Sequence, residues 1–151
     1  MPRYRGVFKT NCPLHNLSFC LFVFLSFFSS HPDYEENPRV ASILGQGGTS
    51  IQDITETVDA VKSGKPRWKN KVGPFRVTRS MGSTVSAVLS TAFKLQGPSY
   101  SISSACSTGA HCIGTGMEQI MLGKADVAVC GAGENEGWEF TSMFDCMGAL
   151  R

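Results

Sequence analysis

Short apolar runs alternate with longer amphipathic stretches in residues 39–151. Runs typical of strands occupy residues 39–44, 99–103 and 126–131. Apolar residues at helical spacing are found over residues 51–61, 80–94 and 106–122. The third strand-like run is apolar throughout, as in a strand covered on both faces. This alternation predicts an α/β fold with a largely parallel sheet and covering helices.

The clearest local signals lie around the first helix. Gly45-Gln-Gly47-Gly48 breaks the first strand, Ser50 with Asp53 three residues later resembles a capping box, and Gly64 ends the helix. A strand, a glycine turn and a helix also occur in dinucleotide sites, where turn N–H groups bind a pyrophosphate. Ser50 stands where such a motif requires its third glycine. We therefore favour a tight turn and expect no bound cofactor.

Residues 64–74 are rich in Pro, Gly, Lys and Arg and predict a loop in which Trp68 is the one large apolar residue. The segment from Lys62 to Arg79 carries seven basic residues and no acid, although the whole chain has a net charge of only +2. Such a small net charge gives no sign of nucleic-acid binding. The simplest interpretation of the basic segment is a solvated surface.

Cys106 follows the second strand-like run and stands at the predicted start of a helix. The free N–H groups and positive dipole end of a helix N-terminus favour a thiolate, and the small residues Ala105, Ser107 and Gly109 leave the sulfur accessible. A nucleophile and an ordinary buried thiol both remain open on these grounds. His111 is five residues further, about 140° around the helix, so we expect a structural histidine that points away from the sulfur.

The six cysteines do not form a disulfide framework by spacing. Cys106 and Cys112 are separated by about 9 Å of helical rise, beyond disulfide reach. This usage predicts a reduced, cytoplasmic protein.

The N-terminal segment has a different character. Arg3, Arg5 and Lys9 precede a twelve-residue apolar run, Leu17–Phe28, which is the layout of a signal peptide but too short to span a bilayer. No Ala-x-Ala-like cleavage site follows. We favour a foreign or mistranslated segment over a targeting signal.

The chain also resembles a known family. Gly97, Ile102, Ala105-Cys106-Ser107-Thr108-Gly109 and Ile113 resemble the active-site signature of the β-ketoacyl synthases, the condensing enzymes of fatty-acid biosynthesis. Residues 122–134 and 138–150 are similar to the same family, most closely to its type I members. The resemblance covers about residues 39–151, and residues 1–38 do not share it. It implies a thiolase-like fold, of which residues 39–151 are part of the N-terminal half.

The resemblance implies an acyltransferase. Cys106 is expected to accept an acyl group from acyl carrier protein, and the acyl group is then condensed with malonyl-carrier protein with loss of CO₂. The backbone N–H of Cys106 is expected to supply half of an oxyanion hole. In the family, two histidines and a lysine from the C-terminal half support decarboxylation, and the sequence ends at Arg151 before any of them. We therefore expect a truncated chain that is inactive alone.

Further roles follow from the same resemblance. Met81 is expected to contact the acyl chain, residues 99–103 to pair with their copy in a homodimer, and acyl carrier protein to dock on Arg67, Lys69 and Lys71. The resemblance implies no metal, nucleic acid or membrane. Two alternatives are a non-catalytic chain that binds carrier protein or dimerises, and a secreted cysteine hydrolase, for which no plausible base is present.

Overall fold

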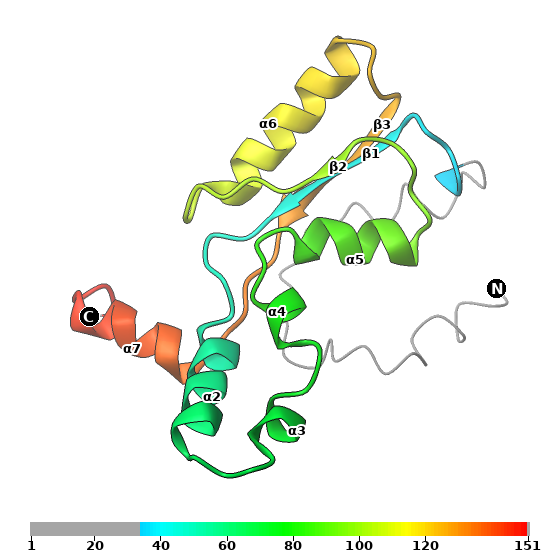
Figure 1. Cartoon of the computed structure of the whole chain (residues 1–151). Coiled ribbons are helices and arrows are strands. Elements are labelled where there is room, and N and C mark those ends of the chain that lie inside the picture. Colours follow the sequence, from blue (N-terminus) through cyan, green and yellow to red (C-terminus); the bar gives the residue numbers. More distant parts are fainter. Residues whose placement is uncertain (1–33, 151) are drawn as a thin grey trace, which may run out of the picture.

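The computed structural model describes residues 34–150 and shows a three-stranded parallel sheet with helices on both faces (Figure 1). The central strand β1, Val40–Gly45, pairs with β2, Ser99–Tyr100, on one side and with β3, Val127–Ala132, on the other. The predicted α/β class and parallel sheet are confirmed. The helices are α2 (Ile51–Lys62), α3 (Trp68–Val72), α4 (Arg76–Arg79), α5 (Thr84–Ala92), α6 (Thr108–Met121) and α7 (Trp138–Cys146).

The two faces of β1 are buried against different helices. α5 and α6 lie on opposite sides of the sheet (Figure 1). On the α5 side, Val40 and Leu44 form a core with Val85 and Val129. Tyr34 also belongs to this core, so the packed part of the chain begins ahead of Arg39, where the resemblance begins. The apolar run Leu17–Phe28 lies outside the described residues.

The helix α2 forms as the sequence predicts. Ser50 is its N-cap, and the Ser50 Oγ atom accepts a hydrogen bond from the Asp53 N–H. After the helix, Gly64 adopts a positive φ of 61°, and its N–H donates to the Val61 carbonyl at 3.2 Å. Capping residues at both ends therefore determine the length of α2.

Three predicted elements differ in extent. The segment 64–74, predicted as a loop, contains the short helix α3. The helix predicted over residues 80–94 is shorter at both ends and forms α5, Thr84–Ala92. The short helix α4 precedes it, and the Ser80 hydroxyl at its end bonds back to the Arg76 and Val77 carbonyls. The strand predicted over residues 99–103 pairs with β1 only at Ser99 and Tyr100.

The orientation of α6 differs from the prediction. The apolar side chains expected to bury this helix are exposed, namely Ile113, Met117, Ile120 and Met121. Thr108, Cys112 and Gly116 are buried instead. A Cβ atom at Gly116 would collide with the Cys130 Sγ atom and lie 3.3 Å from the Ala128 Cβ atom. The helix thus approaches β3 through its small residues, among which Gly116 allows the closest contact.

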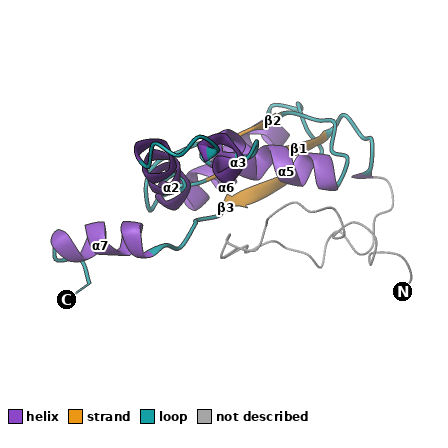
Figure 2. Ribbon diagram, turned by 60° about the horizontal axis from the view of Figure 1, so that its bottom comes forward, coloured by secondary structure: helices purple, strands orange, loops and turns teal. Residues whose placement is uncertain are grey.

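The last helix, α7, stands apart from the layered part of the molecule and lies beside α2 (Figure 2). None of its residues is buried. Within the described residues, no helix has the length and apolar character needed to cross a membrane.

Candidate active site

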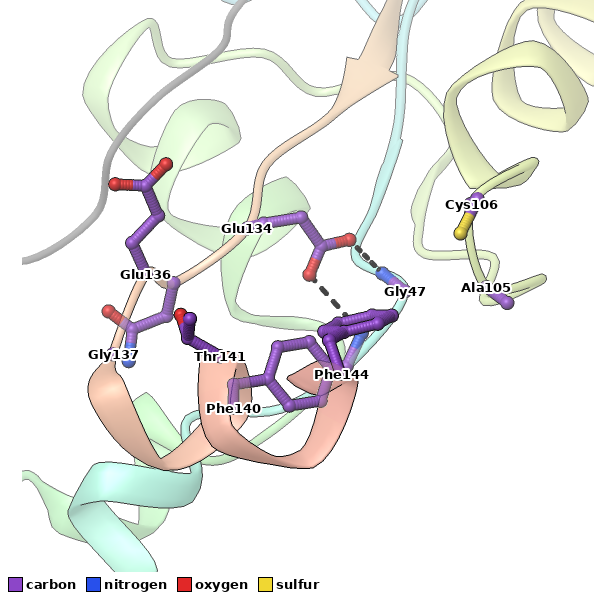
Figure 3. Close-up of a pocket in the computed structure, with 11 residues that line it drawn as sticks. Gly47, Ala105, Cys106, Glu134, Glu136, Gly137, Phe140, Thr141 and Phe144 are labelled. Carbon is purple, nitrogen blue, oxygen red and sulfur yellow. Dashed lines mark hydrogen bonds between the residues drawn. The ribbon is translucent and has the colours of Figure 1, made fainter. Parts of the chain in front are cut away.

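Three segments meet at the carboxyl end of the sheet, because the carboxyl ends of parallel strands lie at one edge. They are the glycine turn after β1, the loop after β2 that carries Cys106, and the segment after β3 that begins at Glu134 (Figure 3). Together with α7 they enclose a pocket of about 300 Å³. Sequence reasoning identified Cys106 as a site residue, and the structure adds the glycine turn, Glu134 and two phenylalanines of α7.

The pocket beside Cys106 is largely apolar. Phe140 and Phe144 pack edge to face with ring centroids 5.1 Å apart and form one wall. Gly48 lies directly against this pair, since an added Cβ would come 2.7 Å from the Phe140 Cζ atom. Glycine is therefore required here for the β1–α2 turn to fit against the aromatic rings.

Cys106 occupies the tip of a tight turn just before α6. The Thr108 Oγ1 atom accepts from the Ser104 N–H at 2.9 Å and donates to the Ala105 carbonyl at 2.7 Å, so one hydroxyl joins both sides of the turn. Ala105 has a φ of 50°, a left-handed conformation that is uncommon outside glycine. Ser107 is the N-cap of α6, and the Cys106 side chain is exposed. The cysteine thus stands one residue ahead of the N-cap, close to where the sequence placed it.

The imidazole of His111 has a partner in this turn. Its Nδ1 atom lies 2.6 Å from the Ser104 Oγ atom. This contact agrees with the structural role predicted from the helical spacing, because the ring bonds a serine that supports the turn.

The Glu134 carboxylate binds the glycine turn that follows β1. The N–H groups of Gly47 and Gly48 both donate to Glu134, at 3.3 Å for Gly48 (Figure 3). These are the N–H groups that a dinucleotide site would present to a pyrophosphate, and here they bind an internal acid instead. Glu134 therefore ties the segment after β3 to the turn after β1. Its only sequence signal is an acid directly after Gly131-Ala-Gly133.

Two other thiols differ from Cys106 in their surroundings. Burial raises the pKa of the Cys112 thiol, and burial together with the neighbouring Cys112 raises the pKa of Cys130 to about 11. Both thiols are therefore protonated near neutral pH. Cys106 is the exposed thiol on the pocket wall.

The remaining predicted site residues lie away from the pocket. Met81 is 46% exposed and is not among the residues that line it. Arg67 is the N-cap of α3, and Lys69 and Lys71 lie on that helix, all three exposed. Lys69 is held 5.8 Å above the ring of Trp68. In the described part of the chain, no group of three or more His, Cys, Asp or Glu residues is arranged to hold a metal ion.

Comparisons with known proteins agree on one family. A sequence model of the β-ketoacyl synthase N-terminal domain matches residues 30–151. The 3-oxoacyl-[acyl-carrier-protein] synthase 1 of Escherichia coli K12 is 51% identical over 117 residues, which are 78% of this chain and 28% of that protein. The synthase of the same name from Haemophilus influenzae is 44% identical over 118 residues, again 78% of this chain and 29% of that protein.

The solved structures show the same fold. A β-ketoacyl synthase from Burkholderia phymatum superposes with a TM-score of 0.66 at 22% identity, covering 81% of this chain and 29% of that one. The ishigamide ketosynthase/chain length factor superposes with a TM-score of 0.64 at 21% identity, over 77% of this chain and 28% of that one. The thiolase-like fold expected from the sequence is thereby confirmed. This chain spans less than a third of the length of these relatives.

Proposed function

This chain belongs to the β-ketoacyl synthase family, and on that premise we propose that Cys106 is the acyl-accepting nucleophile of a 3-oxoacyl-[acyl-carrier-protein] synthase. Residues 39–151 are then part of the N-terminal domain of such an enzyme. The reaction belongs to fatty-acid biosynthesis, and the proposed compartment is the cytoplasm.

One observation carries the proposal: the exposed thiol of Cys106 lies on the wall of an apolar pocket. A hydrocarbon chain gains about 0.8 kcal/mol for each methylene removed from water. The rings of Phe140 and Phe144 supply a surface for such a chain. A fatty acyl group joined to the sulfur has its tail beside these rings, whereas a polar substrate gains little there.

The acyl transfer uses groups that this chain supplies. The Cys106 thiolate attacks the carbonyl carbon of the acyl thioester, a new carbon–sulfur bond forms, and the carrier thiol leaves with a proton from solvent. The backbone N–H of Cys106 is the proposed donor for half of the oxyanion hole. The condensation that follows needs decarboxylation of malonyl-carrier protein, which in this family is supported by groups of the C-terminal half.

The proposed carrier-protein surface is the exposed basic helix α3 with Arg67, Lys69 and Lys71. Attraction to an acidic carrier would be electrostatic and weaken as salt rises, because exposed charges are screened over about 10 Å at 0.1 M salt. Replacing Arg67 and Lys69 with Glu is expected to weaken binding in a sedimentation or calorimetric titration. If the affinity for carrier protein changes neither with salt nor with these replacements, α3 is a solvated surface and not the docking site.

A homodimer is proposed from the edge strand. β2 is the outer strand on its side of the sheet, and both of its residues, Ser99 and Tyr100, are exposed. An open edge of this kind can pair with the same strand of a second copy.

The proposal is tested by acyl transfer to the chain from acyl-carrier protein. Intact-mass and peptide mass spectrometry are expected to find the acyl group on Cys106, and Cys106→Ala should abolish it. An acyl group spread equally over the exposed thiols Cys106 and Cys146 would contradict the assignment. Carrier protein that binds tightly without acylating Cys106 would favour the alternative of a non-catalytic binding chain.

A further inference from the structure

A half-buried ionic cluster lies at the start of α2, outside the pocket. The Arg76 guanidinium donates to the Asp53 Oδ1 atom at 2.6 Å and also to the Glu56 carboxylate. The side chains of Arg76 and Asp53 are only 19% and 12% exposed. Hydrogen bonding from Arg76 lowers the pKa of Glu56. One arginine therefore holds two carboxylates of α2 and joins that helix to α4.

The cluster continues toward the pocket through hydrogen bonds of fixed direction. An ionised carboxylate only accepts, so the Ser50 hydroxyl must donate to the Asp53 Oδ2 atom, at 2.8 Å. The Ser50 Oγ atom in turn accepts from the Asn135 Nδ2 atom at 2.9 Å. Asn135 lines the pocket. A continuous series of contacts thus runs from Arg76 through Asp53 and Ser50 to a residue of the pocket wall.

The contacts from Arg76 to Asn135 and those of Glu134 hold the same segment of the pocket wall, at the successive residues 134 and 135. Glu134 binds the N–H groups of Gly47 and Gly48, and Asn135 binds Ser50. The β1–α2 segment and the segment that leads to α7 are thereby joined at two adjacent positions of the pocket wall. Phe140 and Phe144 follow Asn135 in the chain, so its position helps to determine where the aromatic wall lies.

We infer that Arg76 is a positioning residue for the apolar pocket: through Asp53 and Ser50 it holds Asn135 and with it the wall that receives the acyl tail. The inference rests on the proposed function of that pocket. Without Arg76, Asp53 loses its 2.6 Å ion pair and keeps only the longer ion pair with Arg79, which lies 3.5 Å from the same Oδ1 atom. A buried carboxylate whose ion pair is weakened in this way draws in solvent. The Ser50–Asn135 contact then loses its support, and the pocket no longer holds a chain in a defined position.

The test uses alkyl methanethiosulfonates, from methyl to octyl, with the full chain. These reagents transfer an alkylthio group to a thiol and release a sulfinate, so each product is identified by its mass. The rate at Cys106 is divided by the rate at Cys146, an exposed thiol on α7 that does not line the pocket. For the unchanged chain this ratio is expected to rise with tail length, because the tail enters the pocket.

Arg76→Met is expected to reduce the octyl preference at Cys106 by about three- to tenfold, the scale of one or two lost hydrogen bonds, and to leave the methyl rate within about twofold. Arg76→Lys keeps the charge but cannot bind Asp53 and Glu56 through the two nitrogens of a guanidinium, and it is expected to lose less of the octyl preference. The matched control is Arg39→Met, which removes an exposed bidentate pair with Asp126 and should leave the ratio unchanged.

A double-mutant cycle separates positioning from general stability. Asn135→Ala already removes the contact between Asn135 and Ser50. In that background, Arg76→Met should therefore cause no further loss of octyl preference. An equal loss in both backgrounds would overturn the inference. If Arg76→Met loses its cooperative thermal transition, the Lys variant is compared in both backgrounds instead.

The outcomes distinguish the inference from the proposed function. A rate ratio that does not depend on tail length in the unchanged chain would contradict the acyl pocket itself. A clear tail-length dependence that Arg76→Met and Arg76→Lys both retain would leave the pocket in place and refute the role of Arg76 alone.

Discussion

At the scale of single residues, the surroundings of each thiol distinguish Cys106. Cys112 is buried against the sheet, and Cys130 lies beneath Gly116 of α6. Cys106 is exposed at the tip of a hydrogen-bonded turn. A nucleophilic thiol must be both accessible and ionisable, whereas Cys112 is buried, Cys130 is half-buried, and the pKa of each is raised.

Cys106 is therefore expected to react with iodoacetamide far faster than Cys130 near neutral pH. A pKa of about 11 in place of the ordinary 9.0 lowers the thiolate fraction of Cys130 about a hundredfold. Partial labelling followed by peptide mass spectrometry measures both rates, with urea-unfolded protein as the control. Equal labelling of the two thiols in a folded sample would remove the physical basis for the nucleophile assignment.

The Cys130 thiol also makes the free energy of unfolding depend on pH. Between pH 9.0 and about 11, the folded chain retains a Cys130 proton that the unfolded chain has lost. The unfolded state then binds fewer protons, so the free energy of unfolding falls as the pH rises through this range. Cys130→Ala is expected to make this fall shallower in urea denaturation, whereas Cys146→Ala should not. Identical slopes for all three proteins would show that Cys130 ionises equally in both states.

At the scale of elements, α6 is joined to the sheet by small residues. Thr108, Cys112 and Gly116 face β1 and β3 at a distance that larger side chains do not allow. Gly114, on the same helix, has no neighbouring atom within 4 Å of an added Cβ. The two glycines therefore have opposite roles, which helix propensity alone does not reveal.

Gly114→Ala is expected to stabilise the chain by up to about 1 kcal/mol, since alanine favours a helix over glycine. Gly116→Ala should destabilise it by about 1–3 kcal/mol, because the new methyl group overlaps the Cys130 sulfur. Thermal unfolding of both variants measures the difference. A double variant with Cys130→Ala should recover part of the loss at Gly116. Equal effects of the two glycine variants would contradict the observed packing of α6.

At the scale of the whole molecule, apolar surface remains exposed on the outer side of α6 and on α7. The exposed side chains include Ile113, Met117, Met121, Trp138 and Met147. Exposed apolar surface of this kind favours association.

Replacing Ile113 and Met117 with Lys is expected to reduce self-association of the chain and its binding of an apolar dye. The melting temperature should change little, because neither side chain is buried. Val85→Lys, at a buried position of α5, is the contrasting variant and should unfold the chain. Analytical ultracentrifugation with thermal unfolding gives both readouts. If self-association is unchanged in the variant with Lys at positions 113 and 117, the associating surface does not include this face of α6.

Interactions within a few residues of one another were predictable from the sequence. The N-cap at Ser50, the helix end at Gly64 and the position of Cys106 before α6 each depend on contacts within one helical turn. The parallel sheet followed from the alternation of strands and helices. The Cys106 motif resembled a family, and the comparisons confirmed that family.

The tertiary structure alone decided which faces are buried and which distant residues meet. The periodicity of α6 predicted an apolar face but did not reveal which face packs on the sheet. The buried face carries Cys112 and Gly116, because these small residues pack more closely on β3 than methionine does. The contacts of Glu134 with Gly47 and of Asn135 with Ser50 join residues 87 and 85 positions apart in the chain. Such pairs depend on how strand ends converge at one edge of the sheet, and no local pattern encodes that convergence. The sequence therefore determined that Cys106 precedes a helix, whereas the tertiary structure determined the pocket around it.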